Sequence, residues 1–207
     1  MERTVFSLNK LDNEKIRYKK MSKYVKIRYD KSKLMLKTPL LKVSEIKSGE
    51  KINVIKLNIN NENSKELNFG QNLVNLDKFI LNSAKENSDW FNKGDYSYIG
   101  LVENNEITFK FKNNDNVKIK CNGESININE LKKGYSVRII FDVSGIYINR
   151  NKFGIYLKPY LIDIDVDYIF DSSDDDIVSE FLESKLELNS SENEEIKNEE
   201  NNIELNI

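Results

Sequence analysis

The sequence predicts a mainly β protein with one helix inserted in mid-chain and an acidic C-terminal tail. Three observations support this. Apolar and polar side chains alternate with period two over several short runs, as they do in strands with one buried face. Apolar spacings of three and four residues, typical of a helix, occur over residues 71–86. After residue 166 the chain becomes strongly acidic and poor in apolar residues, a composition typical of disorder.

The N-terminal part contains the first predicted strands. Residues 1–21 are polar and basic, and we expect them to form a flexible arm or an arm that becomes ordered on its ligand. Residues 24–29 alternate strictly, with tyrosine, lysine and arginine on the outward side. Residues 33–37 repeat the scheme and place Met35 outward, so residues 30–32 are predicted to be a hairpin turn.

The middle of the chain alternates strands with the helix. Residues 52–59 form a strand pattern, and the polar residues 60–67 are predicted to be a loop. The helix of residues 71–86 follows. Residues 107–112 and 117–121 are then two further strands, in which lysines and a threonine share the outward side.

The alternation over residues 135–165 predicts three consecutive strands, which would complete the sheet. In the run 153–160, one side carries phenylalanine, isoleucine and leucine, and the other carries Tyr156, Lys158 and Tyr160. Glycines at 134, 145 and 154 mark places where a barrel bends or a backbone approaches closely. This order predicts an OB-fold-like antiparallel β-barrel over residues 22–166 with an inserted mid-chain helix. A sheet sandwich is the alternative that the pattern leaves open.

Charge is distributed unevenly along the chain. Residues 1–160 hold 30 Lys and Arg against 18 Asp and Glu, a net charge of +12, whereas residues 161–207 hold 2 against 16, a net charge of −14. A basic body joined to an acidic tail, residues 167–207, indicates a nucleic-acid partner. A solvated surface with a solubilising tail explains the charges equally well.

Several functional classes find no support in the composition. The chain has no histidine, which removes the commonest metal ligand and general base. Its one cysteine, Cys121, is expected to be a small buried hydrophobe in a reducing compartment. No apolar run approaches the roughly 18 residues of a membrane span, and the N-terminus does not resemble a secretory signal. Asp163 and Asp165 share a strand face but lack acidic companions, so we expect no enzyme activity, metal or cofactor.

Outward tyrosines interleaved with cations are the strongest functional signal. Lysine on a solvent face is ordinary, but a ring that stacks on a base contributes about 1–3 kcal/mol. Trp90 either packs the helix onto the barrel or lines the groove beside Lys93. The predicted nucleic-acid-binding residues are Tyr24, Lys26, Arg28, Lys33, Lys37, Lys110, Lys118, Lys120, Arg138, Tyr147, Arg150, Lys152, Tyr156 and Lys158.

Three segments resemble a known family. They are MLKTPLLKV at 35–43, DWFNK at 89–93 and GIYINRNKFGIYLK at 145–158, within a similarity that covers about residues 22–166. The chain resembles the single-stranded DNA-binding proteins of large nucleocytoplasmic DNA viruses and, more broadly, phage replication proteins with an acidic tail. The matching positions are Thr38-Pro39, Trp90-Phe91, Gly145 and Phe153-Gly154, while Asn92 stands where the pattern has glycine.

The resemblance implies sequence-independent binding of single-stranded DNA during viral DNA replication, recombination or repair, without catalysis. The expected partners are single-stranded DNA or RNA, replication proteins that the acidic tail recruits, and a second copy of the chain. The expected location is the viral replication site in the host cytoplasm or nucleus. The alternative is a protein–protein interaction adaptor or virion component that does not bind nucleic acid.

Overall fold

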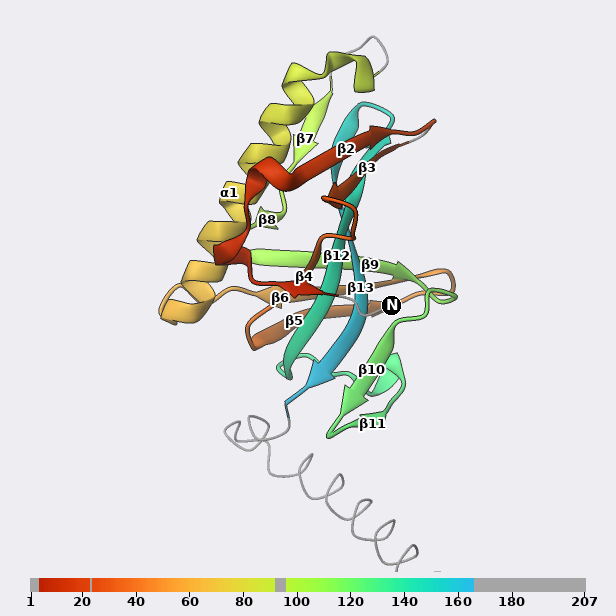
Figure 1. The fold of residues 1–207 in the computed structure, drawn as a ribbon. Coiled ribbons are helices and arrows are strands. Elements are labelled where there is room, and N and C mark those ends of the chain that lie inside the picture. Colours follow the sequence, from red (N-terminus) through yellow and green to blue (C-terminus); the bar gives the residue numbers. More distant parts are fainter. Residues whose placement is uncertain (1–3, 23, 92–95, 166–207) are drawn as a thin grey trace, which may run out of the picture. The chain divides into compact units, whose positions relative to one another are not determined.

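The computed structural model describes residues 4–22, 24–91 and 96–165. Over these residues the chain is mainly β, with thirteen strands in one sheet and a single α-helix (Figure 1). The acidic tail predicted at residues 167–207 lies outside the described residues, as do Asn92 and Lys93. No helix of the described part is long and apolar enough to cross a membrane.

Six strands precede the helix along the chain, and seven follow it. The first half contains β1 (Val5–Phe6), β2 (Ile16–Lys20), β3 (Tyr24–Tyr29), β4 (Met35–Lys37), β5 (Leu41–Ser48), β6 (Ile52–Asn58) and α1 (Ser64–Glu86). The second half contains β7 (Ser97–Ile99), β8 (Val102–Glu103), β9 (Glu106–Lys112), β10 (Lys118–Cys121), β11 (Glu124–Ser125), β12 (Ser136–Asn149) and β13 (Lys152–Ile164). Short 3-10 turns at Leu8–Lys10, Asn13–Lys15, Ser88–Trp90 and Ile128–Glu130 connect some of them.

The sheet is open and mostly antiparallel, with the order β11-β10-β13-β12-β5-β6-β9-β8. Beyond this path, β3 and β4 pair with β12, β2 pairs with β3, β1 pairs with β4, and β7 pairs with β13. The sheet curls so that β9 contacts β13 without pairing to it. The rings of Phe109 and Phe141 meet edge to face in the interior, 5.2 Å apart. The prediction of a mainly β fold with one inserted helix is therefore confirmed, and its antiparallel sheet is open.

Two long strands, β12 and β13, replace the three closing strands predicted from the sequence. They form one antiparallel hairpin whose register shifts between Ile140 and Phe141 and again between Val143 and Gly145. Each shift is a β-bulge, which bends a strand without ending it. A Cβ at Gly145 would lie 2.3 Å from the Val25 carbonyl oxygen, so β3 can pair with β12 at this point only because the residue is glycine.

The helix α1 begins earlier than the sequence pattern indicates. Residues 60–67 were predicted to be a loop, but Asn63 caps a helix that starts at Ser64. The Asn63 side chain accepts hydrogen bonds from the backbone N–H groups of Lys65 and Glu66, at 3.0 and 3.4 Å. The first helical turn is polar because it faces solvent, and polar capping residues carry no apolar periodicity. One side of the helix buries Phe69, Leu73, Leu76, Ile80 and Ala84.

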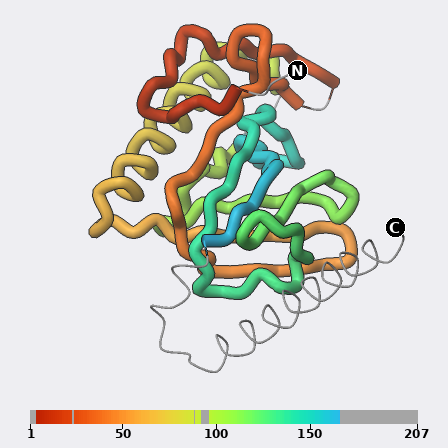
Figure 2. Tube along the Cα trace, turned by 60° about the horizontal axis from the view of Figure 1, so that its bottom comes forward, coloured from red at the N-terminus to blue at the C-terminus, as the bar shows by residue number. Residues whose placement is uncertain are grey.

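The N-terminal segment is part of the sheet, so the predicted flexible arm of residues 1–21 is not what the described residues 4–21 show. Ile16 is buried, and β2 pairs along its full length with β3. The 3-10 turn at Leu8–Lys10 contacts α1, and Figure 2 shows this segment lying against the helix. The apolar side chain of Ile16 and the backbone pairing together hold the segment in place.

The hairpin predicted around residues 30–32 is also absent. The turn itself forms, with a bridge between Tyr29 and Ser32 and Asp30 at a φ of 48°. However, β3 and β4 do not pair with each other: both run antiparallel to β12, one after the other. This arrangement also buries Met35, which was expected to face outward.

Candidate nucleic-acid interface

Strand register places the predicted rings and cations of β3, β12 and β13 on one side of the sheet. Residues that are directly paired across strands project to the same side. Tyr24 pairs with Tyr147, which pairs with Gly154 on its other side. In the next row Lys26 pairs with Gly145, which pairs with Tyr156. The opposite side of the same strands is the core, where Val25, Ile146 and Ile155 are buried.

These residues line a groove of about 500 Å³ that we call the tyrosine groove. Its walls come from β3, the turn after β3, β12 and β13. Seven of the fourteen predicted residues line it: Tyr24, Lys26, Arg28, Lys33, Tyr147, Tyr156 and Lys158. Tyr160, Asp142 and Ser144 complete its polar lining.

The tyrosines of the groove differ in how firmly they are held. Tyr24 is the most exposed of the described tyrosines in the groove, with 42% of its surface accessible. The ring of Tyr147 lies across Gly154, where an added Cβ would come within 2.8 Å of the Tyr147 Oη and 3.0 Å of its Cζ. Partial burial raises the pKa of Tyr147 and of Tyr156, so both phenols stay neutral near pH 7. Neutral rings held at fixed positions are suited to stacking on bases.

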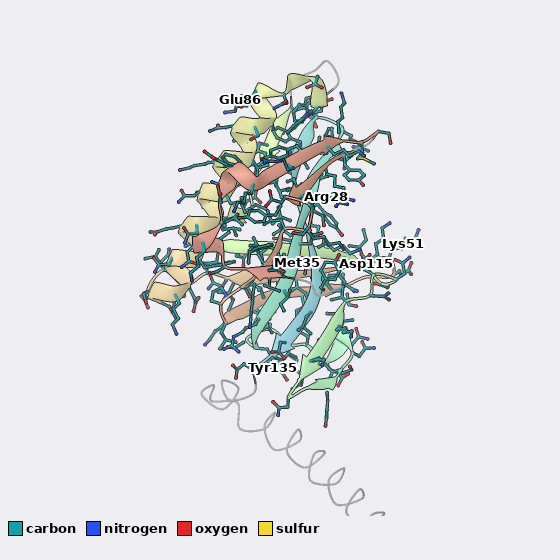
Figure 3. The ribbon with its side chains drawn as sticks, in the orientation of Figure 1. Arg28, Met35, Lys51, Glu86, Asp115 and Tyr135 are labelled. Carbon is teal, nitrogen blue, oxygen red and sulfur yellow. The ribbon has the colours of Figure 1, made fainter. Side chains whose placement is uncertain are left out.

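The cations around the groove have few carboxylate partners. Arg28, which is labelled in Figure 3, donates a hydrogen bond at 3.0 Å to the backbone carbonyl of Lys31. Lys33 donates to the Tyr160 hydroxyl and lies 4.7 Å from the centre of the same ring. Lys158 is the exception, because its Nζ forms an ion pair with Asp115 at 3.0 Å.

Asp142 is an unexpected acidic residue at the floor of the groove. It is 6% exposed, and its Oδ2 accepts a hydrogen bond from Ser144 at 2.9 Å. Burial raises the pKa of Asp142, while the nearby charges of Lys33, Lys26 and Lys158 act in the opposite direction. Within the described residues none of these lysines forms an ion pair with Asp142, and its Oδ1 accepts no hydrogen bond. The charge of this buried carboxylate is therefore only partly balanced.

A second groove of about 620 Å³ continues from the tyrosine groove. The two share Tyr147 and Tyr156. Three more predicted residues, Lys110, Arg150 and Lys152, line this second groove. Glu103 and Glu106 line it too, so its electrostatic character is mixed.

The last four predicted residues lie further along the sheet, on β4, β10 and β12, on the side to which the groove residues project. Lys37 pairs with Ile140, Ile140 with Leu161, and Leu161 with Lys118 on β10. In the row beyond, Arg138 pairs with Asp163, which pairs with Lys120. Arg138 also forms an ion pair with Asp165 at 3.5 Å. These two rows contain acidic and aliphatic residues but no tyrosine.

Sequence reasoning missed four groove residues or neighbours. Tyr160 lies on the outward side that the alternation predicts, but it is not among the fourteen predicted residues. Asp142 is a single acidic residue in a strand, a pattern that carries no functional signal. Arg17 and Lys19 belong to the predicted arm, although the alternation of residues in Ile16–Lys20 is the signal of a strand.

Trp90, whose role the sequence leaves open, is a packing residue. The Trp90 ring lies 5.0 Å from that of Tyr18, between the end of α1 and β2, and it does not line either groove. Cys121 is buried, as expected. The described residues contain no group of three or more metal-ligating side chains.

Comparison with known proteins gives a limited set of matches. No protein-family model and no curated protein matches the chain. Among solved structures, the single-stranded DNA-binding protein gp2.5 of bacteriophage T7 matches with a TM-score of 0.46 and 9% identity, over 70% of this chain and 97% of that one. The single-stranded DNA-binding protein of bacteriophage Enc34, in complex with ssDNA, matches with a TM-score of 0.45 and 12% identity, over 73% and 96%. The resemblance to proteins of large nucleocytoplasmic DNA viruses stays a prediction.

Proposed function

We propose that this chain binds single-stranded DNA without sequence preference in the tyrosine groove. One observation carries the proposal: the phenol rings of Tyr24, Tyr147 and Tyr156 and the cations of Lys26 and Arg28 emerge together on one face of the sheet. Rings stack on any base, and cations neutralise the phosphates between the bases.

Single strands fit this surface better than a duplex. The bases of a duplex are stacked on one another, so their faces are not available to protein rings. Stacking and phosphate contacts give little discrimination between bases, which is why the proposed binding is sequence-independent.

A ring-specific substitution tests the stacking role. Tyr156→Ala should weaken binding of a labelled oligo-dT by about 5- to 150-fold, because one stacked base contributes about 1–3 kcal/mol. Tyr156→Phe keeps the ring and should bind within about twofold of the unchanged protein. Fluorescence anisotropy measures both. Equal affinities for the Ala and Phe variants would rule out stacking on Tyr156.

Salt dependence tests the phosphate contacts. If about five phosphates are neutralised, the logarithm of the binding constant should fall with the logarithm of salt concentration at a slope near −3.5. A slope near zero in the same titration would mean that the groove binds no nucleic acid and would favour a protein-interaction role.

We also propose a role for the acidic residues 167–207. Their negative charge, tethered to a basic body, competes with phosphates and recruits replication proteins. Deletion of these residues should tighten DNA binding at low salt and abolish capture of such partners. Unchanged affinity after the deletion would remove the competitive role. The setting we propose is viral DNA replication, recombination or repair, in the host cytoplasm or nucleus.

A further inference from the structure

The β2–β3 hairpin contains two pairs of like charges placed directly opposite each other. Arg17 on β2 pairs with Arg28 on β3, and Lys19 pairs with Lys26. Directly opposed residues of an antiparallel pair project to the same side, where like charges destabilise the pairing. A bound anion beside these cations would offset their mutual repulsion.

That anion is not supplied by the described part of the chain. None of these four cations has a carboxylate within ion-pair distance there. The guanidinium of Arg17 donates to the backbone carbonyls of Glu14 and Ile16, which are neutral.

Other cations of the same segment do have carboxylate partners. Lys20 projects to the other side of β2 and forms an ion pair with Asp89 at 3.9 Å. Lys15, just before the strand, lies 3.7 Å from Asp12. The cations that lack a carboxylate partner in the described part of the β2–β3 hairpin therefore lie on one face, whereas Lys15 and Lys20 each have a partner.

This face is continuous with the tyrosine groove. Lys26 and Arg28 line the groove, whereas Arg17 and Lys19 lie one strand further out and are exposed. A single cross-strand row runs from Lys19 through Lys26 and Gly145 to Tyr156. With strands about 4.8 Å apart, this row extends about 14 Å from the ring to the outermost cation.

We propose that the outer face of β2 is a phosphate-binding extension of the tyrosine groove, in which Arg17 and Lys19 hold the backbone of the strand whose bases stack on the tyrosines. The proposal rests on the function proposed above. The like-charge pairs are then a feature of the unliganded protein, and the bound polyanion relieves their repulsion.

The test is the double variant Arg17→Gln/Lys19→Gln in the full chain, titrated with labelled oligo-dT at several salt concentrations. Two lost phosphate contacts should make the salt slope shallower by about 1.4, which corresponds to about 25-fold weaker binding at 0.1 M salt and convergence near 1 M. Each single variant should change the slope by about 0.7. The matched control is Lys78→Gln/Lys85→Gln on exposed positions of α1, which removes the same charge and should leave the slope unchanged.

Thermal unfolding separates a binding role from a structural one. Without DNA the double variant should unfold at the same or a higher temperature than the unchanged protein, because the like-charge repulsion is gone. An unchanged salt slope, or a slope change equal to that of the α1 control, overturns the proposal. If Tyr156→Ala also fails to weaken binding, the proposed function fails as well. If Tyr156→Ala weakens binding but Arg17→Gln/Lys19→Gln has no effect, the tyrosine groove binds DNA and β2 does not extend it.

Discussion

Replacement of Asp142 by asparagine should tighten DNA binding and remove its dependence on pH. The side chain keeps its size and its acceptor for Ser144, but the negative charge at the groove floor is lost. A phosphate bound on the rim about 8 Å away is repelled by about 2 kcal/mol at an effective dielectric constant of about 20. Screening at 0.1 M salt, with a Debye length of about 10 Å, reduces this to about 1 kcal/mol, or about fivefold in affinity.

The pH dependence follows from the direction of the pKa shift. Burial raises the pKa of Asp142, so on acidification the folded protein neutralises this carboxylate at a higher pH than a free aspartate is neutralised. Binding by the unchanged protein should therefore strengthen as the pH falls, and binding by Asp142→Asn should stay flat. The chain has no histidine, so no imidazole titrates in this range.

The same substitution has a predictable effect on stability. A raised folded-state pKa means that the folded protein binds the proton more tightly than the unfolded chain does. The contribution of Asp142 to stability is therefore fully present below its unfolded pKa near 3.8 and is lost as the pH rises through its folded value. Asp142→Asn should thus be at least as stable as the unchanged protein at pH 7.

Anisotropy titrations from pH 5 to pH 8 measure the affinities, and thermal unfolding over the same range measures stability. The control is Glu86→Gln at the last residue of α1, which removes one exposed charge (Figure 3). It should leave the pH profile of binding unchanged. If Asp142→Asn keeps both the affinity and the pH profile of the unchanged protein, the carboxylate does not face the bound strand and the electrostatic reasoning is wrong.

Three further predictions concern the groove and the helix. Gly154→Ala should weaken oligo-dT binding by about 5- to 30-fold, because the added Cβ displaces the ring of Tyr147, which stacks on one base. Adding Tyr147→Phe removes the hydroxyl oxygen closest to that Cβ and should restore part of the affinity. If affinity is not restored, the loss has another cause. Asp115→Asn should free the ammonium of Lys158 to bind a phosphate and should steepen the salt slope of DNA binding by about 0.7, measured by titrations at several salt concentrations. An unchanged slope would mean that Lys158 binds no phosphate. Asn63→Ala removes the N-cap of α1 and should lower the free energy of unfolding by about 1 kcal/mol, measured by urea denaturation. DNA affinity should not change. A loss of affinity would show that the start of α1 contributes to the interface.

The faces of the strands could be predicted from the sequence, because alternation is a local property. Tyr24, Lys26 and Arg28 lie on the outward side as the pattern indicates, and so do Tyr156 and Lys158. That these two sets meet depends on the pairing of β3 with β12, which alternation within one strand does not encode.

Pairing partners and bulges were the features that local patterns could not supply. A turn at Asp30 suggested a hairpin, but whether two flanking segments pair with each other or with a distant strand is decided by burial across the whole sheet. The burial of Met35 depends on the same choice. The polar start of α1 was missed because capping residues are selected for hydrogen bonding, which leaves no periodic apolar signal.

The two β-bulges of the β12–β13 hairpin decide where the chain can change its length. Ser144 is the extra residue of one bulge, because Val143 and Gly145 pair with successive residues of β13. Tyr147 therefore faces the groove although it lies four residues after the buried Val143. Deletion of Ser144 would leave a regular strand with Tyr147 still on the groove face, whereas deletion of Ile146 would bring Tyr147 to a core position, because side chains alternate along a strand. Related sequences should therefore place one-residue gaps of this hairpin at the bulges and not in the regularly paired stretches.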